Sequence, residues 1–584
     1  MADGNAITDQ PTESLRKWCT RRLTQMENER TSFETHWREL AEFFMPRRGR
    51  LTLQGRTTGS GSSGGGTGYN DGTKRHQHII DGTPIAARET LSAGMMAGIT
   101  SPARPWFRNT VADPMLAENG LVKNWLYDVD SRMRDTLQRS NFYEAVHAFY
   151  DEIGTFGTAV MLADEDREDT VVFRTLTAGE YWLALDSKGR IDTLGRKCKW
   201  TVRQCVQEFG FDACSTSVQN QYRAGNVEQW VDIVHLIEPN TNRDPRKADH
   251  RGMPYRSIYY EAACRDDRVL RVRGYRENPI LGARWSVLGG DSYGTSPAMN
   301  ALGDAKSLQI QEKRKALAID KFVDPPLNVP VEMRNHGVSS IPGGINYYSM
   351  SQGNRPGISS AYEGNPAVLS PLLEDEQQLR ERINRFMFAD LFLMLANSDR
   401  RQITAREIEE RHEEKLLMLG PVLERLNSEF LNRLIDRLFG IMLRAGMIPP
   451  PPESLQGVTL KTEYISVLAQ AQKQVALGGL DNFLQRASMV FQVSPSTMDK
   501  VDFDQIIDET ADMLGVSPRI VRSDDDVAAK RQSEQQMQQM QQMAAMAKPA
   551  TDVAGAVTKM AGTETAENSV MAQVANAMAG AAPA

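Results

Sequence analysis

Cysteine is scarce in this sequence, with five in 584 residues and no pair at C-x-x-C spacing. An odd count without such a pair argues against a disulfide framework and against a zinc knuckle, so a reducing compartment is the expected setting. The cysteines are Cys19, Cys198, Cys205, Cys214 and Cys264.

Long hydrophobic runs are also missing. A membrane-spanning helix needs about 18 consecutive apolar residues, and the best candidate run, residues 391–396, is far shorter. The first residues, MADGNAITDQPTESLRKW, lack the apolar core of a signal peptide. These absences predict a soluble, cytoplasmic chain with no membrane partner.

An excess of positive charge is absent as well. The chain has 68 Lys and Arg against 75 Asp and Glu, which gives a net charge of −7. A tight nucleic-acid binder normally shows a basic excess, so the composition argues against one, although DNA could pass nearby without being gripped. The hydrophobic content of 40% is that of a folded protein, and the length corresponds to roughly 2–4 domains.

The first half of the chain is predicted to be mixed α and β. Ser14 is a candidate cap for a long helix over 14–45, where large apolar residues recur every three to four positions. A glycine-rich stretch over 55–72 predicts a mobile loop. The other expected elements are a helix over 83–98, two helices within 120–163, strands over 170–200 with a turn at 186–189, short helices at 201–210 and 227–237, and a hairpin over 255–275.

The second half is predicted to be mostly helical. Gly294, Ser296 and Pro297 form a helix-start motif, since glycine lets the chain turn, serine caps the helix and proline suits the first helical position. This helix should run to about residue 322 and stop at Asp324-Pro325-Pro326. Short strands and turns are expected over 325–372, a helix over 373–395, and a break at 397–401.

A longer helix is predicted over 403–448, with one apolar stripe and a solvated, ion-paired first half. Gly420 and Pro421 should kink it. The stripe consists of Leu416, Leu419, Leu423, Leu426, Phe430, Leu434, Leu438 and Met442. A smaller helical region follows over 462–520. The Gln/Met-rich segment 532–546 has a narrow apolar stripe, so it is expected to depend on neighbouring copies, and the tail from 548 is expected to be disordered.

The sequence contains only weak signs of a nucleotide or metal site. Gly72-Thr73-Lys74 reverses the Lys-Ser/Thr order that a phosphate-binding loop needs. His76 and His78 lack a third ligand at suitable spacing, and the acidic runs 164–169 and 524–526 lack calcium-loop spacing. We therefore expect no metal and no cofactor, and a subunit driven by nucleotide hydrolysis stays an alternative that these residues disfavour.

Ser292 lies in Gly290-Asp291-Ser292-Tyr293-Gly294, which has the G-x-S-x-G spacing of a hydrolase nucleophile elbow. The elbow needs its helix to start at the nucleophile, whereas the predicted start is at Ser296-Pro297. Only His336 and His412 follow in the chain as candidate bases, and the repeated strand–helix units of a hydrolase are missing. A serine hydrolase is the second alternative, and a turn residue is the favoured interpretation of Ser292.

The remaining pattern is architectural. Two long helices flank a turn-rich insertion, and a third, longer helix follows. Such a chain does not form a self-sufficient bundle, but it makes sense if many copies pack side by side, helix against helix.

Six segments then suggest a family. They are WRELAEFFMPRRGRL, IDGTPIAARETLSAGMMAGITSPARPWF, GEYWLALDSKGRIDTLGR, GDSYGTSPAMNALGDAKSLQ, ITAREIEERHEEKLLMLGPVLERLNSEFLNRLIDRLF and EYISVLAQAQK, spread over roughly residues 30–480. In this content and order the sequence resembles the head-to-tail connector, or portal, proteins of short-tailed phages (podoviruses).

The resemblance implies a structural protein without enzymatic activity that forms a ring, typically a homododecamer, at one capsid vertex. Double-stranded DNA would pass through its channel during packaging and ejection. The implied partners are other copies of the chain, a terminase, the major capsid or scaffold protein, and tail adaptor proteins. The implied location is the virion, with the host cytoplasm during assembly.

The implied subunit is α+β and mainly helical. By position, the wing corresponds to 1–295 together with the long kinked helix at 403–448, and the stem to helices at 296–322 and 373–395. The clip would be 323–372, the tunnel loop 396–402, the crown and C-terminal helical barrel 455–547, and the disordered tail 548–584.

Five basic residues are candidates to face the DNA channel. Arg400 and Arg401 lie beside the break between helices, and Lys313, Arg314 and Lys315 lie on the first stem helix. Three consecutive helical residues cannot all face one surface. The alternative is that these side chains pair with carboxylates of neighbouring subunits. Channel walls without tight phosphate contacts let DNA slide, which suits an acidic chain.

Overall fold

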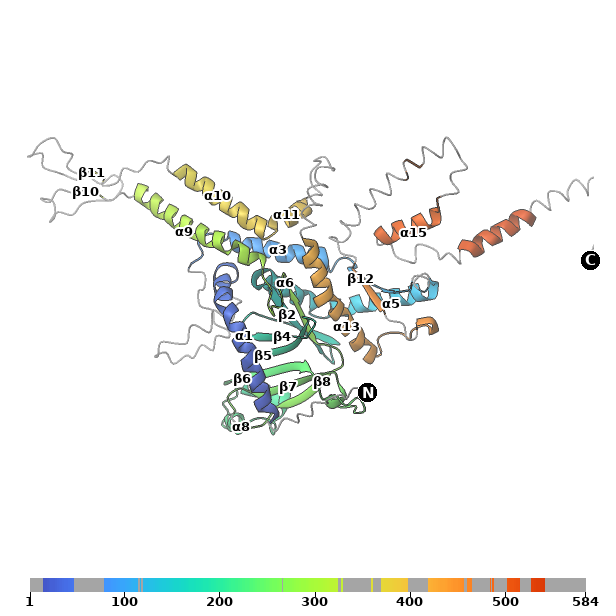
Figure 1. Ribbon diagram of the computed structural model, residues 1–584, viewed down its shortest axis with the longest axis horizontal. Helices are drawn as coiled ribbons and strands as arrows, with labels where there is room; N and C mark the ends of the chain where they lie inside the picture. The colour runs from blue at the N-terminus through green and yellow to red at the C-terminus, as the bar shows by residue number, and fades with distance from the viewer. Residues whose placement is uncertain are drawn as a thin grey trace, which may run out of the picture. The chain divides into compact units, whose positions relative to one another are not determined.

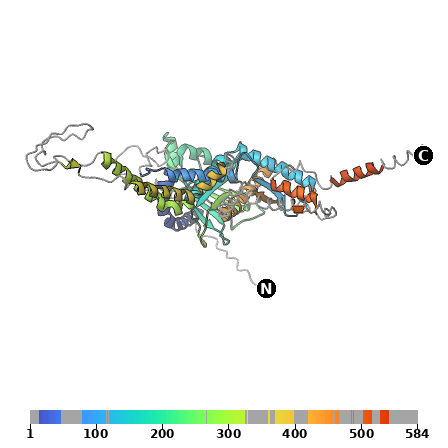
Figure 2. The same ribbon diagram turned by 90° about the horizontal axis from the view of Figure 1, so that it is seen from above.

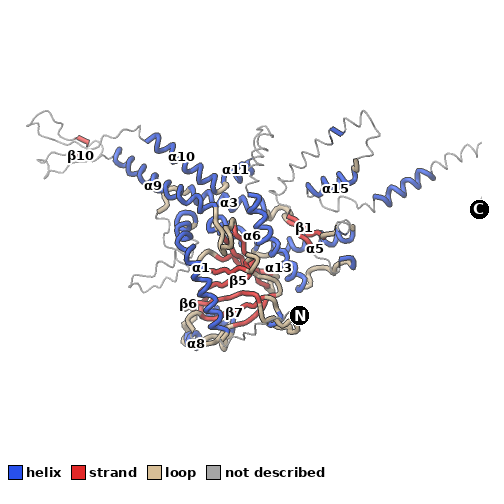
Figure 3. Tube along the Cα trace, viewed as in Figure 1, coloured by secondary structure: helices blue, strands red, loops and turns tan. Residues whose placement is uncertain are grey.

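The computed structural model describes the greater part of the chain. The described residues are 14–46, 78–113, 116, 119–264, 266–323, 327–328, 359–360, 369–397, 419–455, 460–464, 484, 486–487, 501–514 and 527–540. They fall into two compact units, one of Met1–Ala112 with Trp125–Phe503 and one of Asp113–Asn124 with Asp504–Ala584. The fold is helix-rich and includes antiparallel sheets (Figure 3).

The larger unit contains two principal sheets. The five-stranded sheet has the order β4-β5-β6-β7-β8, and the three-stranded sheet has the order β3-β2-β9. The strands are β2 (Thr158–Glu165), β3 (Val171–Leu176), β4 (Tyr181–Leu185), β5 (Ile191–Thr201), β6 (Trp230–Pro239), β7 (Tyr255–Glu261), β8 (Arg271–Tyr275) and β9 (Ile280–Arg284). Shorter pairs join β1 (Phe107–Val111) to β12 (Leu460–Tyr464) and β10 (Leu327–Asn328) to β11 (Ser359–Ser360).

Some helices pack against these sheets, and two others form a pair that extends away from them (Figure 1). In the larger unit the helices are α1 (Leu15–Phe44), α3 (Thr83–Ile99), α6 (Phe142–Phe156), α7 (Val202–Phe209), α8 (Thr216–Arg223), α9 (Pro297–Val323), α10 (Leu369–Phe386), α11 (Ala389–Asn397) and α13 (Asn432–Arg444). The helix α5 (Gly120–Arg139) begins in the smaller unit, which also contains nearly all of α15 (Phe503–Leu514) and a helix over 527–540. None of the described helices is long and apolar enough to cross a membrane.

The core of the larger unit joins α1 to the chain just before α9. The rings of Trp37 on α1 and Tyr293 meet edge-on with centroids 5.1 Å apart, and both side chains are buried. A second stack joins α6 to the later helices, because Phe149 lies parallel to Phe430 at 4.2 Å. Such aromatic pairs bury large apolar area and fix the relative position of the elements that carry them.

Several sequence predictions are confirmed. Ser14 accepts a hydrogen bond from the Lys17 amide at the start of α1, and α3 lies over the expected residues. The predicted hairpin is formed by β7 and β8.

The two helices expected within 120–163 are confirmed as α5 and α6, but the second ends earlier than expected, at Phe156. One other predicted helix is a strand, and one is divided. Residues 158–163 belong to β2, because Gly157, in the left-handed region (φ 76°), ends α6. Residues 230–237 belong to β6, which pairs with β5 and β7 and is buried along most of its length. The helix expected over 373–395 begins earlier, at Leu369, and is interrupted at Phe388, which has a φ of 55°.

The long helix predicted over 403–448 is described only from residue 419. Residues 419–426 are helical, a π-helical turn, η5 (Asn427–Leu431), follows, and α13 completes the segment. The apolar stripe is confirmed within this part, where Leu426, Leu434 and Met442 are buried. Gly420 and Pro421 lie at the beginning of the described segment, so the kink there stays a prediction.

Candidate functional site

The start of α9 is built by the motif that the sequence predicts. The Ser296 hydroxyl accepts a hydrogen bond from the Met299 amide (3.1 Å) and donates one to the Thr155 carbonyl (2.7 Å). Pro297 is the first residue of α9. One side chain therefore caps α9 and ties its beginning to the end of α6.

Gly294 is required by a close backbone approach. A Cβ built on it would lie 2.4 Å from the Gly157 carbonyl oxygen, and a Cβ on Gly157 would lie 2.3 Å from the Gly294 carbonyl oxygen. The Gly294 amide also donates to the Thr158 hydroxyl (2.8 Å). The two glycines let the chain pass against the α6–β2 turn before α9 begins.

Ser292 has no catalytic partner in the part of the chain that the structure describes. It is half-buried in a bend before α9, and no described histidine bonds to its hydroxyl. His336 and His412 lie outside the described residues. With the first residue of the helix five positions later, the elbow geometry is not formed.

A serine–histidine contact does occur elsewhere, between Ser257 and His235, whose Nε2 is 2.8 Å from the hydroxyl. It does not suit nucleophilic catalysis. The Arg196 Nε–H donates to His235 Nδ1 (3.1 Å), so the ring proton is on Nε2 and points at the serine. A general base would need a free lone pair there.

The antiparallel helices α9 and α10 lie side by side (Figures 1 and 2), and Lys315 clamps them together. Its ammonium lies 2.6 Å from Glu376 of α10 and 2.7 Å from Glu312 of its own helix. Burial lowers the pKa of Lys315, but its hydrogen bonds to both carboxylates outweigh this and the pKa is raised overall. Lys315 is thus neutralised within its own chain.

A second ion-pair group joins α10 to the turn before α3. Arg380 contacts Asp81 (2.9 Å) and Glu312 (2.5 Å), while the Gln309 side-chain oxygen accepts hydrogen bonds from the amides of Ile80 (2.6 Å) and Asp81 (2.9 Å). Burial raises the pKa of Asp81, but the hydrogen bonds from Thr83 and Arg380 outweigh it and lower the pKa overall. The helix pair is fixed to the body of the larger unit here.

The opposite face of α9 is uncovered in the single chain. Ile310 and Leu317 are about half exposed, at 53% and 52%. Lys313 and Arg314 are exposed on the same side and make no ion pair with any described residue. Helical spacing places these residues together and Lys315 on the other side.

The outer face of α10 carries exposed carboxylates. Glu374 and Glu381 are exposed there together with Arg385, on the side of the helix away from the buried Leu379 and Ile383. The α9–α10 pair thus presents cations and apolar side chains on one helix and two exposed carboxylates on the other, an arrangement suited to packing against further copies.

Other sequence candidates lie outside the described residues. They are Arg400, Arg401, Gly72-Thr73-Lys74, His76 and the acidic run 524–526. In the run 164–169, Asp164 accepts from the Tyr275 hydroxyl and Glu165 pairs with Arg444. The described residues contain no group of three or more His, Cys, Asp or Glu side chains placed to hold a metal ion.

Sequence reasoning missed the ion pairs that fix α10. Asp81 had a detectable signal, because it lies two residues before Thr83-Pro84 and bonds the Thr83 amide (2.7 Å), as a residue before a helix start does. No local sequence signal points to Arg380, because its partners Asp81 and Glu312 are 299 and 68 positions away in the chain.

Comparisons with known proteins identify the family of the chain. A family model described as bacteriophage head to tail connecting protein matches residues 16–521. A probable portal protein of Bordetella phage BPP-1 is 44% identical over 97% of this chain and 99% of its own length. The portal protein of Salmonella phage epsilon15 is 42% identical over 97% and 99%.

Among solved structures, the neck of an empty gene transfer agent particle matches with a TM-score of 0.34 and 12% identity, covering 68% of this chain and 86% of that one. That likeness is too low to support an argument. The sequence matches extend over nearly the whole chain, and the chain belongs to the family of bacteriophage head-to-tail connecting proteins.

Proposed function

We propose that this chain is the structural portal subunit of a phage, and that copies of it form a ring at one capsid vertex. The observation that carries the proposal is the uncovered face of α9, where Ile310 and Leu317 flank Arg314. Half-exposed apolar side chains at helical spacing beside unpaired cations suit the next subunit, whose α10 presents Glu374 and Glu381.

The parts of such a subunit are assigned by position. The stem consists of α9 and α10, the clip lies within 323–372, and the wing consists of the sheets with α1 and the segment ending at α13. The tunnel loop falls at 396–402 and the crown and C-terminal barrel at 455–547. Within the last of these, residues 528–540 are exposed along a whole helix, which supports burial against neighbouring copies.

The DNA contacts are proposed at fewer residues than the sequence suggests. Arg400 and Arg401 remain channel candidates, and so do Lys313 and Arg314, which are exposed on α9. Lys315 is left out because Glu312 and Glu376 already neutralise it. Few unpaired cations favour transient phosphate contacts that do not stall a sliding duplex.

The remaining roles follow from a portal function. The ring is a dodecamer through which double-stranded DNA enters and leaves, with no enzymatic activity of its own. Its partners are a terminase, the capsid or scaffold protein and tail adaptor proteins. It assembles in the host cytoplasm and resides in the virion.

Electron microscopy of the purified full-length chain tests the proposal. Rings with a central hole support it. A protein that stays monomeric at every concentration, or one with catalytic turnover, contradicts it.

A further inference from the structure

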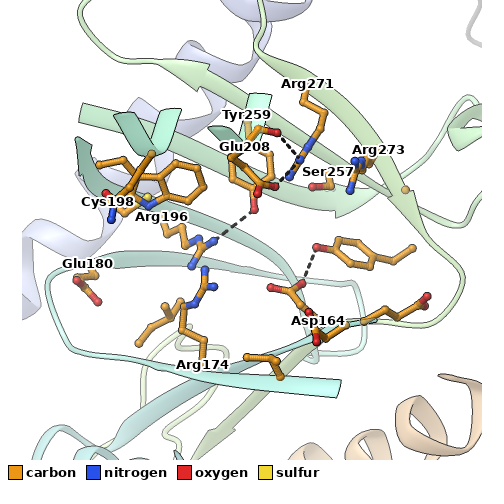
Figure 4. Close-up of a pocket in the computed structure, with 18 of the residues that line it drawn as sticks. Asp164, Arg174, Glu180, Arg196, Cys198, Glu208, Ser257, Tyr259, Arg271 and Arg273 are labelled. Atoms are coloured by element: carbon orange, nitrogen blue, oxygen red, sulfur yellow. Dashed lines mark hydrogen bonds and ion pairs between the residues drawn. The ribbon is translucent and has the colours of Figure 1, made fainter. Parts of the chain in front are cut away.

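A polar cavity of about 1110 Å³ lies between the two principal sheets of the larger unit (Figure 4). Its walls come from β2 and β3 of one sheet and from β5, β7 and β8 of the other. The volume is near that of small-molecule sites, roughly 300–1,000 Å³. Basic side chains outnumber acidic ones in its lining. It is separate from the α9–α10 pair and has no part in the proposed portal function.

Arg196 of β5 is the most deeply placed of these cations, with only 3% of its surface exposed. Its Nε donates to His235 Nδ1 (3.1 Å) and its Nη2 to the Tyr259 hydroxyl (3.3 Å). Neither partner is an anion, and no described carboxylate forms an ion pair with it. A guanidinium is always charged, and a buried charge without a counter-ion is costly.

Further unpaired arginines line the same cavity. Arg174 of β3 and Arg273 of β8 line the cavity and make no ion pair with any described residue, and Arg276, just after β8, is in the same situation. Figure 4 shows the guanidinium groups of Arg196 and Arg174 pointing toward one another from strands of different sheets. Arg174, Arg273 and Arg276 are exposed, so water screens their charges. The repulsion that an anion between Arg196 and Arg174 would relieve is therefore felt mainly at the buried Arg196.

The acidic lining residues are largely engaged elsewhere. Glu208 pairs with Arg271 (2.5 Å) and Glu165 with Arg444 (2.5 Å). Asp164, the carboxylate whose field reaches Arg196, accepts from the Tyr275 hydroxyl (2.9 Å). The converging cations therefore retain an excess of positive charge.

The buried histidine that holds Arg196 is consistent with this excess. His235 is fully buried and stacked on Tyr259 with ring centroids 3.8 Å apart. Burial, and then the charges of Arg196, Arg174 and Arg271, hold the pKa of His235 well below its usual range. The imidazole stays neutral and serves as a fixed acceptor that orients Arg196.

We propose that this cavity is a binding site for a small phosphate-bearing anion, held between Arg196 and Arg174. A carboxylate presents two coplanar oxygens and is matched by one guanidinium fork. The cations here come from two sheets, so an anion with oxygens in several directions and a larger charge fits them better. Asp164 limits the affinity because its charge opposes that of the ligand.

The site is tested by titrating the purified full-length chain with pyrophosphate, using isothermal titration calorimetry at constant ionic strength. We expect saturable binding that Arg174→Gln weakens about tenfold, the effect of losing one charge-assisted contact. Asp164→Asn should strengthen binding severalfold. The matched control is Arg167→Gln, an exposed arginine of the β2–β3 turn outside the lining, which should bind as the wild type does.

Three outcomes overturn the proposal. The first is no saturable binding of pyrophosphate at millimolar concentration. The second is equal binding of pyrophosphate by Arg174→Gln and the wild type. The third is binding of a hexaglutamate peptide, which presents carboxylates only, in place of pyrophosphate. Because the variants lie away from α9 and α10, their rings should form normally, and the result is independent of whether the portal proposal holds.

Discussion

The Lys315 ammonium lies 2.6 Å from a carboxylate oxygen of Glu376, across the contact between α9 and α10. Glu376 is fully buried, and its second oxygen has no hydrogen-bond partner. A carboxylate in this position depends on its cation, because removal of one partner from a buried pair leaves an uncompensated charge.

Lys315→Met should therefore lower the free energy of unfolding by about 2–3 kcal/mol, below the largest values for such pairs because the Lys315 side chain is partly exposed. Chemical denaturation at fixed protein concentration measures the change. The double variant Lys315→Met, Glu376→Leu should recover most of the loss, since neither charge remains. Equal losses in the single and double variants would show that the pair does not act in this way.

The backbone contact at Gly294 predicts a second stability effect. Gly294→Ala should destabilise the chain by about 1–3 kcal/mol, since its Cβ meets backbone that cannot move aside easily. Gly303→Ala is the matched control, because Gly303 lies on α9 with nothing within 4 Å of its Cβ position. This control should be neutral or stabilising by about 0.5–1 kcal/mol. The melting temperatures of both variants test this prediction. A Gly294→Ala variant that melts at the wild-type temperature would contradict the close backbone approach.

Asp130 predicts how stability depends on pH. Burial raises its pKa from 3.8 to about 7, more than the hydrogen bonds from Asn109 lower it. A carboxyl group with a raised pKa in the folded state stabilises the fold fully below pH 4, and this contribution is lost as the pH rises to about 7. Melting temperatures between pH 4 and pH 8 should fall less steeply for Asp130→Asn than for the wild type. Parallel curves for the two proteins would contradict the assignment.

The proposed channel contacts predict a packaging defect. Arg400→Ala combined with Arg401→Ala should reduce the amount of DNA that particles package or retain, because two transient phosphate contacts per subunit are removed around the ring. The exposed turn residues Arg167 and Lys188, both changed to Ala, provide a control that removes the same number of charges per subunit. If the double variant packages and retains as much DNA as the wild type, the assignment of Arg400 and Arg401 to the channel wall is contradicted.

The sequence predicted elements whose signals are local. Ser14 and the Ser296-Pro297 pair mark helix starts through hydrogen bonds to amides three residues away, so their geometry is encoded in neighbouring residues. The apolar stripe through Leu426 and Leu434 repeats with the helical period over several turns, so the buried face of this helix could also be predicted from neighbouring residues.

The errors arose where distant strands decide the structure. Residues 230–237 form a strand because β5 and β7 pair with them on both sides, a long-range effect that overrides local preference. The interruption at Phe388 and the pair Arg380–Asp81 also depend on tertiary contacts. The cavity around Arg196 could not be predicted, since its cations come from β3, β5 and β8 and share no sequence spacing.

The most direct test of the account is negative-stain electron microscopy of the purified chain and two matched variants. Leu317→Glu places a charge on the uncovered face of α9, and Leu288→Glu makes the same change at a 75% exposed residue in the turn before α9. The account predicts rings with a central hole for the wild type and Leu288→Glu, and isolated subunits or small fragments for Leu317→Glu. Intact rings of Leu317→Glu, or no rings from the wild type, would contradict the claim that α9 packs against its copies around a channel.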